Sequence, residues 1–166
     1  MSHVIRTRTD AEKEFVKIFS QMSNEHQSWK VWSDFCYMAA AAISNSVDKV
    51  SAPGREKQYL QTIKKYRKPY QENFSKLLAI VVEALERDPD QDFLGELFMA
   101  LELGNHWKGQ SFTPYSVTRM MAAMNVGDEL QEKIKHDGYI SVSDPACGAG
   151  ATLMAFANEC MRQKIN

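Results

Sequence analysis

The chain has 166 residues, enough for a domain with its own hydrophobic core. Apolar residues make up 44% and charged residues 25%, which excludes a disordered or fibrous protein and indicates an ordinary globular one. The net charge of −1 excludes an overall field that attracts nucleic acid, so any contact with nucleic acid requires a local basic patch.

Nothing in the sequence indicates a membrane, a disulfide framework or a metal site. The apolar run over residues 37–43 is far shorter than a membrane span, and the first six residues lack the apolar segment of a secretion signal. Cys36, Cys147 and Cys160 are odd in number and form no CxxC pair, and the four histidines lie far apart. We therefore expect a cytoplasmic protein that binds no metal.

Helices joined by short loops are predicted for the first two thirds of the chain. Thr9 and Glu12 have the spacing of a capping box, which indicates a helix beginning there. Trp29, Trp32 and Phe35 begin the widest apolar stripe, so their helix is expected to be central to the core. Apolar residues at helical spacing predict further boundaries, with helices over residues 29–50, 55–67, 69–85, 93–101 and 115–124 and breaks at 51–54, 88–90 and 104–105.

Two charged stretches accompany these helices. The basic stretch is interpreted either as a phosphate-binding surface or as a solvated helix face. The acidic stretch is expected to face solvent. The basic members are Arg55, Lys57, Lys64, Lys65, Arg67 and Lys68, interleaved with Tyr59, Tyr66 and Tyr70, and the acidic members are Glu83, Glu86, Asp88, Asp90 and Asp92.

The last part of the chain has a different pattern. Residues 128–136 are predicted to form a short charged helix or a loop. The four residues from Tyr139 to Val142 predict a β-strand, and the glycine-rich sequence that follows leads into a predicted helix over residues 149–162. One strand cannot satisfy its own backbone groups, so we expect this segment to be the opening βα unit of a sheet whose other strands lie elsewhere.

The glycine-rich turn is typical of a nucleotide-binding corner. Gly148 and Gly150 tolerate positive φ, which lets the chain turn sharply toward the N-terminus of the following helix. A P-loop requires Lys-Ser or Lys-Thr where Ala151 and Thr152 stand, and a dinucleotide fingerprint requires a third glycine where Leu153 stands. Because Asp144 suits an ammonium group better than a pyrophosphate, S-adenosylmethionine is the cofactor that fits best.

Two segments together resemble the N6-adenine-specific DNA methyltransferases. Residues 144–153, DPACGAGATL, are similar to that family's DPxCGxGxxL motif, and residues 109–117, GQSFTPYSV, resemble its GQFFTPxxV segment, in the same order and at a similar spacing. The nearest resemblance is to the modification subunits of type I restriction systems and to phage adenine methylases. The helical stretch before the motifs also resembles the N-terminal region of these enzymes.

The resemblance implies a role for each matching residue. Thr113 and Pro114 would contact the methionine end of S-adenosylmethionine, Asp144 would hold its amino group, and Phe112 would wall the pocket. Ser111 replaces the usual aromatic residue, a departure that would loosen the pocket. The expected cofactor-binding residues are Phe112, Thr113, Pro114, Asp144, Pro145, Ala146, Cys147, Gly148 and Gly150. Cys147 is interpreted as a small half-buried side chain rather than as a nucleophile.

The expected architecture is mainly α, with a helical domain over residues 1–108 and the start of a truncated, Rossmann-like methyltransferase domain over residues 109–166. The family's catalytic tetrapeptide, (N/D)PP(Y/F), which binds a flipped adenine, does not occur in the sequence. No catalytic residue is therefore assigned, and the chain alone is expected to be inactive and to bind the cofactor weakly or not at all.

An alternative interpretation remains open. Thr113 and Pro114 are also an ordinary helix start, as N-cap and first helical residue. The helical region would then be a DNA-binding or subunit-interaction module with a vestigial cofactor corner. In either case the implied partners are DNA, through the parent enzyme, and specificity or other methylase subunits. The unpaired strand from Tyr139 to Val142 predicts disorder there or self-association.

Overall fold

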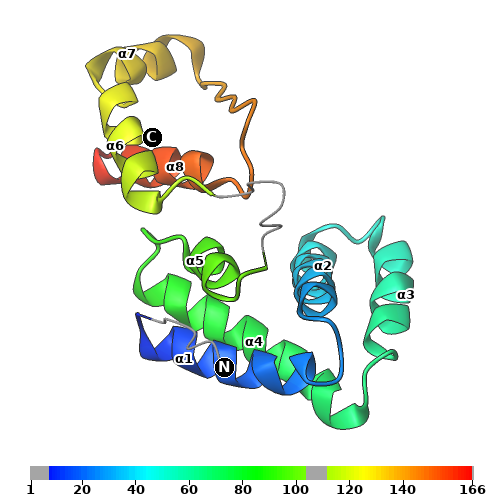
Figure 1. The fold of residues 1–166 in the computed structure, drawn as a ribbon. Helices are drawn as coiled ribbons and strands as arrows, with labels where there is room; N and C mark the ends of the chain where they lie inside the picture. The colour runs from blue at the N-terminus through cyan, green and yellow to red at the C-terminus, as the bar shows by residue number, and fades with distance from the viewer. Residues whose placement is uncertain (1–7, 104–111, 166) are drawn as a thin grey trace. The chain divides into compact units, whose positions relative to one another are not determined.

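The computed structural model describes residues 8–103 and 112–165, whose helices are drawn in Figure 1. The chain divides into two compact units, between residues 84 and 85. The described residues contain helices and no strand, which confirms a mainly α chain. None of the described helices is long and apolar enough to cross a membrane. The helices are α1 (Asp10–Ser23), α2 (Ser28–Val47), α3 (Ala52–Ile63), α4 (Lys68–Arg87), α5 (Phe93–Ala100), α6 (Tyr115–Asn125), α7 (Asp128–Asp137) and α8 (Ala151–Arg162).

The first helix begins where the capping signal predicts. The hydroxyl of Thr9 accepts a hydrogen bond of 3.1 Å from the backbone N–H of Glu12. The carboxylate of Glu12 accepts from the backbone N–H of Arg8, one residue before the position that a capping box requires. Phe15 and Phe19 are completely or almost completely buried on the inner face of α1, as their spacing predicts.

The core of the first unit is aromatic. Phe15 meets Phe35 edge to face, with ring centroids 5.4 Å apart, and also contacts Trp32 edge to face at 6.2 Å. Such pairs stabilise a core beyond the area they bury. Trp32 and Phe35 are therefore core residues, as predicted, whereas Trp29 is 54% exposed.

The break predicted at residues 51–54 lies three residues earlier, at residues 48–51. Helix α2 ends at Val47, and Pro53 and Gly54 already lie in the first turn of α3. Proline is tolerated there because the first backbone N–H groups of a helix have no partner within it.

Several members of the basic stretch make contacts inside the first unit. The hydroxyl of Tyr66, a buried residue, donates a hydrogen bond of 2.8 Å to Asp34. The guanidinium of Arg55 pairs with Asp48 at 2.9 Å, beyond the end of α2. Arg67 pairs with Glu25. The solvated members of the stretch are its lysines, which are exposed: Lys57, Lys64, Lys65 and Lys68.

The helices of the second unit begin at the predicted residues, except that α8 begins two residues later than predicted. Pro114 occupies the N-cap position of α6 with φ −54° and ψ 137°, so Thr113 is not the N-cap and that prediction is wrong. Because the backbone of Pro114 is not helical, the first helical residue is Tyr115. Residues 128–137 form a helix rather than a loop, closed by Gly138 in the left-handed conformation.

The strand predicted from Tyr139 to Val142 is absent, and that prediction is wrong. Residues 139–144 have no regular secondary structure, so the expected Rossmann-like βα unit is not formed within the described residues. The physical reason is that a strand exists only through hydrogen bonds to a neighbouring strand, and residues 8–103 and 112–165 offer none. The predicted domain boundary between residues 108 and 109 lies outside the described residues.

Candidate cofactor site

The glycine corner has the backbone conformation that its sequence predicts. Gly148 and Gly150 have φ of +52° and +87°, in the left-handed region that residues with a Cβ rarely adopt. The backbone N–H of Gly150 donates a hydrogen bond of 2.7 Å to the carbonyl of Cys147, which closes the turn. Gly150 also occupies the N-cap position of α8, so the turn leads directly to the first N–H groups of that helix.

The Asp144 carboxylate is fixed to this turn. Its Oδ1 accepts a hydrogen bond of 2.9 Å from the backbone N–H of Ala146, and the residue is half-buried. The bond orients the carboxylate without neutralising its charge. A cation that approaches the turn would therefore meet a positioned negative group.

The Phe112 side chain brings the two sequence motifs together. A Cβ added to Gly148 would lie 3.6 Å from Cδ1 of the Phe112 ring, an ordinary van der Waals distance. The Phe112 ring also lies beside the ring of Phe98, with the two centroids 4.9 Å apart. Phe112 thus lies at the corner, where the prediction that it walls a pocket requires it to be.

The remaining predicted site residues lie at the surface of the second unit. Thr113 and Pro114 are exposed, and so are the residues of the turn, Pro145, Ala146 and Cys147. Cys147 is exposed rather than half-buried, which corrects that part of the prediction. An exposed turn is accessible to a ligand but does not enclose one, so the described residues form an open corner rather than a closed pocket.

Helices α6 and α8 pack closely behind the corner. Their buried contact residues are small, because Ala122 of α6 and Ala151 and Ala155 of α8 are each at most 7% exposed. Thr118 is fully buried, and its hydroxyl donates a hydrogen bond of 2.8 Å to the carbonyl of Tyr115. Small side chains let two helix backbones approach closely, so the segment that precedes α6 and the turn that precedes α8 belong to one packed assembly.

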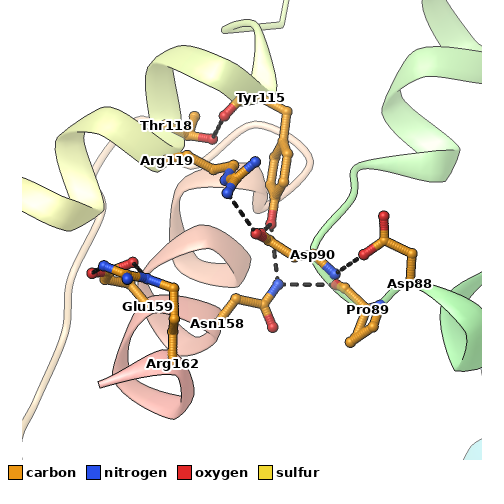
Figure 2. A network of polar contacts seen from close by, with 9 residues as sticks. All are labelled: Asp88, Pro89, Asp90, Tyr115, Thr118, Arg119, Asn158, Glu159 and Arg162. Carbon is orange, nitrogen blue, oxygen red and sulfur yellow. Dashed lines mark hydrogen bonds and ion pairs between the residues drawn. The ribbon is translucent and has the colours of Figure 1, made fainter. Parts of the chain in front are cut away.

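A polar network joins these two helices to the loop at residues 88–90 (Figure 2). The hydroxyl of Tyr115 donates to Oδ1 of Asp90 at 3.0 Å, and the amide of Asn158 donates to the Tyr115 hydroxyl at 3.1 Å and to the carbonyl of Pro89 at 3.0 Å. The guanidinium of Arg119 pairs with the other oxygen of Asp90 at 3.0 Å. Partial burial is the main cause that raises the pKa of Tyr115, and the Asp90 carboxylate adds to it.

The sequence did not reveal this network. Asp90 belongs to the acidic stretch expected to face solvent, yet it is half-buried and engaged, and Asp92 is buried at the start of α5, where it accepts from the Gly95 N–H at 2.9 Å. The one available signal was the spacing of Tyr115 and Arg119, four residues apart and so on one helix face.

The far end of α8 has a second set of polar contacts. The guanidinium of Arg162 donates two hydrogen bonds to the buried Glu159, which lowers the pKa of that carboxyl to about 2. The amide of Gln163 donates to Glu159 and also, at 3.1 Å, to the carbonyl of Val126 at the end of α6. Both ends of the α6–α8 contact are therefore closed by side-chain hydrogen bonds.

No family model, curated protein or solved structure matches this chain. Within the described residues, no three histidine, cysteine, aspartate or glutamate side chains gather in a way that could hold a metal ion. The assignment of the corner therefore depends on the two motifs and on the contacts around them.

Proposed function

We propose that this chain is the N-terminal part of an S-adenosylmethionine-dependent, adenine-N6-specific DNA methyltransferase of a restriction-modification type system. It would contribute a helical region and one side of the cofactor pocket. The observation that carries the proposal is the position of the Phe112 ring beside Gly148, because it brings together the two segments that resemble the family's cofactor motifs.

The residues at the corner suit this cofactor. The cofactor's ammonium group would pair with the Asp144 carboxylate, which Ala146 already orients. Its carboxylate would face the first N–H groups of α8 beyond Gly150. Thr113 and Pro114, both exposed, would contact the methionine chain. When bound, S-adenosylmethionine supplies an activated methyl group.

Methyl transfer requires residues that this sequence does not contain. A flipped adenine needs an acceptor for its N6 amino group and an aromatic side chain to stack on, and no (N/D)PP(Y/F) tetrapeptide is present. We therefore propose that the chain alone is inactive and that other residues of a parent protein supply the catalytic site. If the reading frame that encodes this chain continues and encodes an (N/D)PP(Y/F) tetrapeptide, the proposal is supported. If the frame continues without such a tetrapeptide, the proposal is contradicted.

The cofactor proposal can be tested on the chain as it is, by recording amide ¹⁵N–¹H spectra during a titration with S-adenosylmethionine to millimolar concentration. The expected result is weak binding, with shifts concentrated at Phe112, Thr113 and residues 144–150. Asp144→Asn should abolish these shifts because the ammonium group loses its partner. Asp128→Asn, which removes an exposed carboxylate at the start of α7, is the matched control and should leave them unchanged. Equal responses of both variants would reject the proposed role of Asp144.

A second candidate function is favoured by the surface of the first unit. Ile43, Val47 and Val50 are 60%, 79% and 92% exposed near the end of α2, and the lysines of the basic stretch are exposed as well. These features suit a subunit- or DNA-binding module whose cofactor corner is vestigial. A gel shift at low salt that weakens steeply as salt rises would favour this function, and the absence of binding at low salt would count against DNA contact.

A further inference from the structure

The segment of residues 112–115 is attached to the glycine corner and to α8 at its two ends, and we call it the strap. At one end the ring of Phe112 lies against Gly148. At the other end the Tyr115 hydroxyl accepts the hydrogen bond of 3.1 Å from Asn158 (Figure 2). The strap is thus a bridge between two fixed points rather than a free loop.

The strap and the part of α8 between Gly150 and Asn158 have similar lengths. Asn158 follows Gly150 by eight residues of α8, which corresponds to a rise of about 12 Å along the helix. The three residue steps of the strap span at most about 10 Å when extended, and the aromatic side chains at both ends supply the remaining reach. Thr113 and Pro114 lie between the two attachments.

The attachment at Tyr115 is directional. Its hydroxyl has one proton, which it donates to Asp90, so its lone pairs accept from Asn158. Asp90 is itself held by the ion pair with Arg119, one turn further along α6. Asn158 is held by its second hydrogen bond, to the Pro89 carbonyl. Each partner of the hydroxyl thus has a second bond that does not involve Tyr115.

We propose that Tyr115 and Asn158 are positioning residues, which hold the strap so that Phe112 stays on Gly148 and Thr113 and Pro114 face the cofactor's methionine end. This inference rests on the proposed function. It assigns a role to two residues that touch neither the glycine turn nor the proposed cofactor, and that neither resembling motif identifies. Loss of their hydrogen bond frees the start of α6 to move along α8 and takes Phe112 away from the turn.

The first test measures this geometry without any ligand. An aromatic ring shifts the resonances of protons close to it, so the Gly148 α-protons report the position of Phe112. Tyr115→Phe, which keeps the ring and removes only the hydroxyl, and Asn158→Ala should each reduce that ring-current shift by at least half. The matched controls are Tyr37→Phe, which removes a hydroxyl bonded to the Arg55 carbonyl, and Asn125→Ala, which removes an amide bonded within α6. An unchanged Gly148 resonance in both test variants would overturn the proposal.

The second test uses S-adenosylmethionine itself as the probe. In each test variant the dissociation constant obtained from the Gly150 amide shift should rise about fivefold, the effect of one neutral hydrogen bond. A displaced ring with unchanged affinity would overturn the positioning role. An unmodified chain that gives no shifts would instead reject cofactor binding by this chain, while the Gly148 resonance still decides whether Tyr115 and Asn158 hold the strap. If one of the two test variants no longer gives the dispersed spectrum of a folded unit, the result from the other variant decides the test.

Discussion

The two units of this chain are stabilised in different ways. In the first unit, large aromatic residues of α1 and α2 fill the interior, and Phe15, Phe19 and Phe35 are almost completely buried. In the second unit, the contact between α6 and α8 is made of small residues and is closed at its ends by polar networks around Tyr115 and Glu159. Stability from buried aromatic area is large and non-directional, whereas stability from hydrogen bonds is smaller and fixes orientation.

The difference agrees with the roles proposed for the two units, partner contact for the first and cofactor binding for the second. A helical region that must remain folded while it contacts a partner benefits from a large apolar core. A cofactor corner benefits from contacts that set the positions of a few residues, even though each contributes little to stability. The second unit also exposes apolar residues on α6 and α8, namely Met120, Met121, Met124, Leu153, Met154 and Met161.

The largest expected effect is in the aromatic core. Phe15→Ala should lower the free energy of unfolding of the first unit by about 3–5 kcal/mol, because it leaves a cavity where three aromatic rings meet. Urea unfolding followed by hydrogen exchange would show whether the loss is confined to residues 8–84. Val50→Ala, at a residue 92% exposed, is the control and should change stability by less than about 0.5 kcal/mol. An equal loss of protection in α6 and α8 would contradict independent stabilisation of the two units.

A smaller effect is expected at the buried pair of Tyr66 and Asp34 in the first unit. Tyr66→Phe removes the donor to Asp34, which is 6% exposed, and should cost about 1–3 kcal/mol because a buried carboxylate loses a hydrogen bond. Tyr37→Phe, which removes a longer bond of 3.3 Å, should cost less in the same urea titration. Equal costs for the two substitutions would mean that the burial of Asp34 contributes nothing.

In the second unit, the glycine turn should be sensitive to backbone strain rather than to volume. Gly150→Ala places a Cβ in open space but forces alanine to a φ of +87°, so we expect a cost of about 1–2 kcal/mol. Gly127→Ala is the control, since its Cβ would also meet nothing and its φ is −166°. Thermal unfolding of the two variants would give the comparison, and an equal decrease would show that the left-handed conformation is not required.

The smallest expected effect is on acid stability. The pKa of Glu159 lies at about 2 in the folded chain, below its ordinary value of 4.5, because Arg162 and Gln163 donate to the carboxylate. Its stabilising contribution is therefore complete above about pH 4.5 and is lost as the pH falls toward 2. In the Glu159→Gln variant, the hydrogen-exchange rates of the α8 amides should therefore depend less on pH between 4.5 and 2. Asp48→Asn, whose carboxyl also has a pKa of about 2 beside Arg55, should do the same for the first unit alone.

The sequence predicts the helices better than the contacts between them. Periodicity and capping give α1, α4 and α6 to within a few residues, because these signals are local. The hydrogen bonds of Tyr115 to Asp90 and to Asn158 join residues 25 and 43 positions apart, and nothing at either end indicates the partner. The strand at residues 139–142 was predicted from its residue types, but strand formation depends on a partner strand, which local sequence does not reveal.

Some residues of the candidate site can likewise be identified from the sequence, and others only from the structure. Gly148, Gly150 and Asp144 were identified because a sharp turn and a cation-binding group need particular residue types. The role of Phe112 followed from a resemblance, and its contact with Gly148 came from the structure. Tyr115 and Asn158 carry no comparable signal, because a tyrosine and an asparagine on helices have many other uses.

The most direct test of the central claim compares two ligands that share an adenosine group. S-adenosylmethionine carries an ammonium group and no phosphate, and ATP carries a triphosphate, so the Asp144 carboxylate should favour the first and repel the second. With each ligand at the same millimolar concentration, we expect S-adenosylmethionine to shift the amide resonances of Gly148 and Gly150, and ATP to leave them unmoved. Equal or larger shifts with ATP would contradict the account of this corner as an S-adenosylmethionine site.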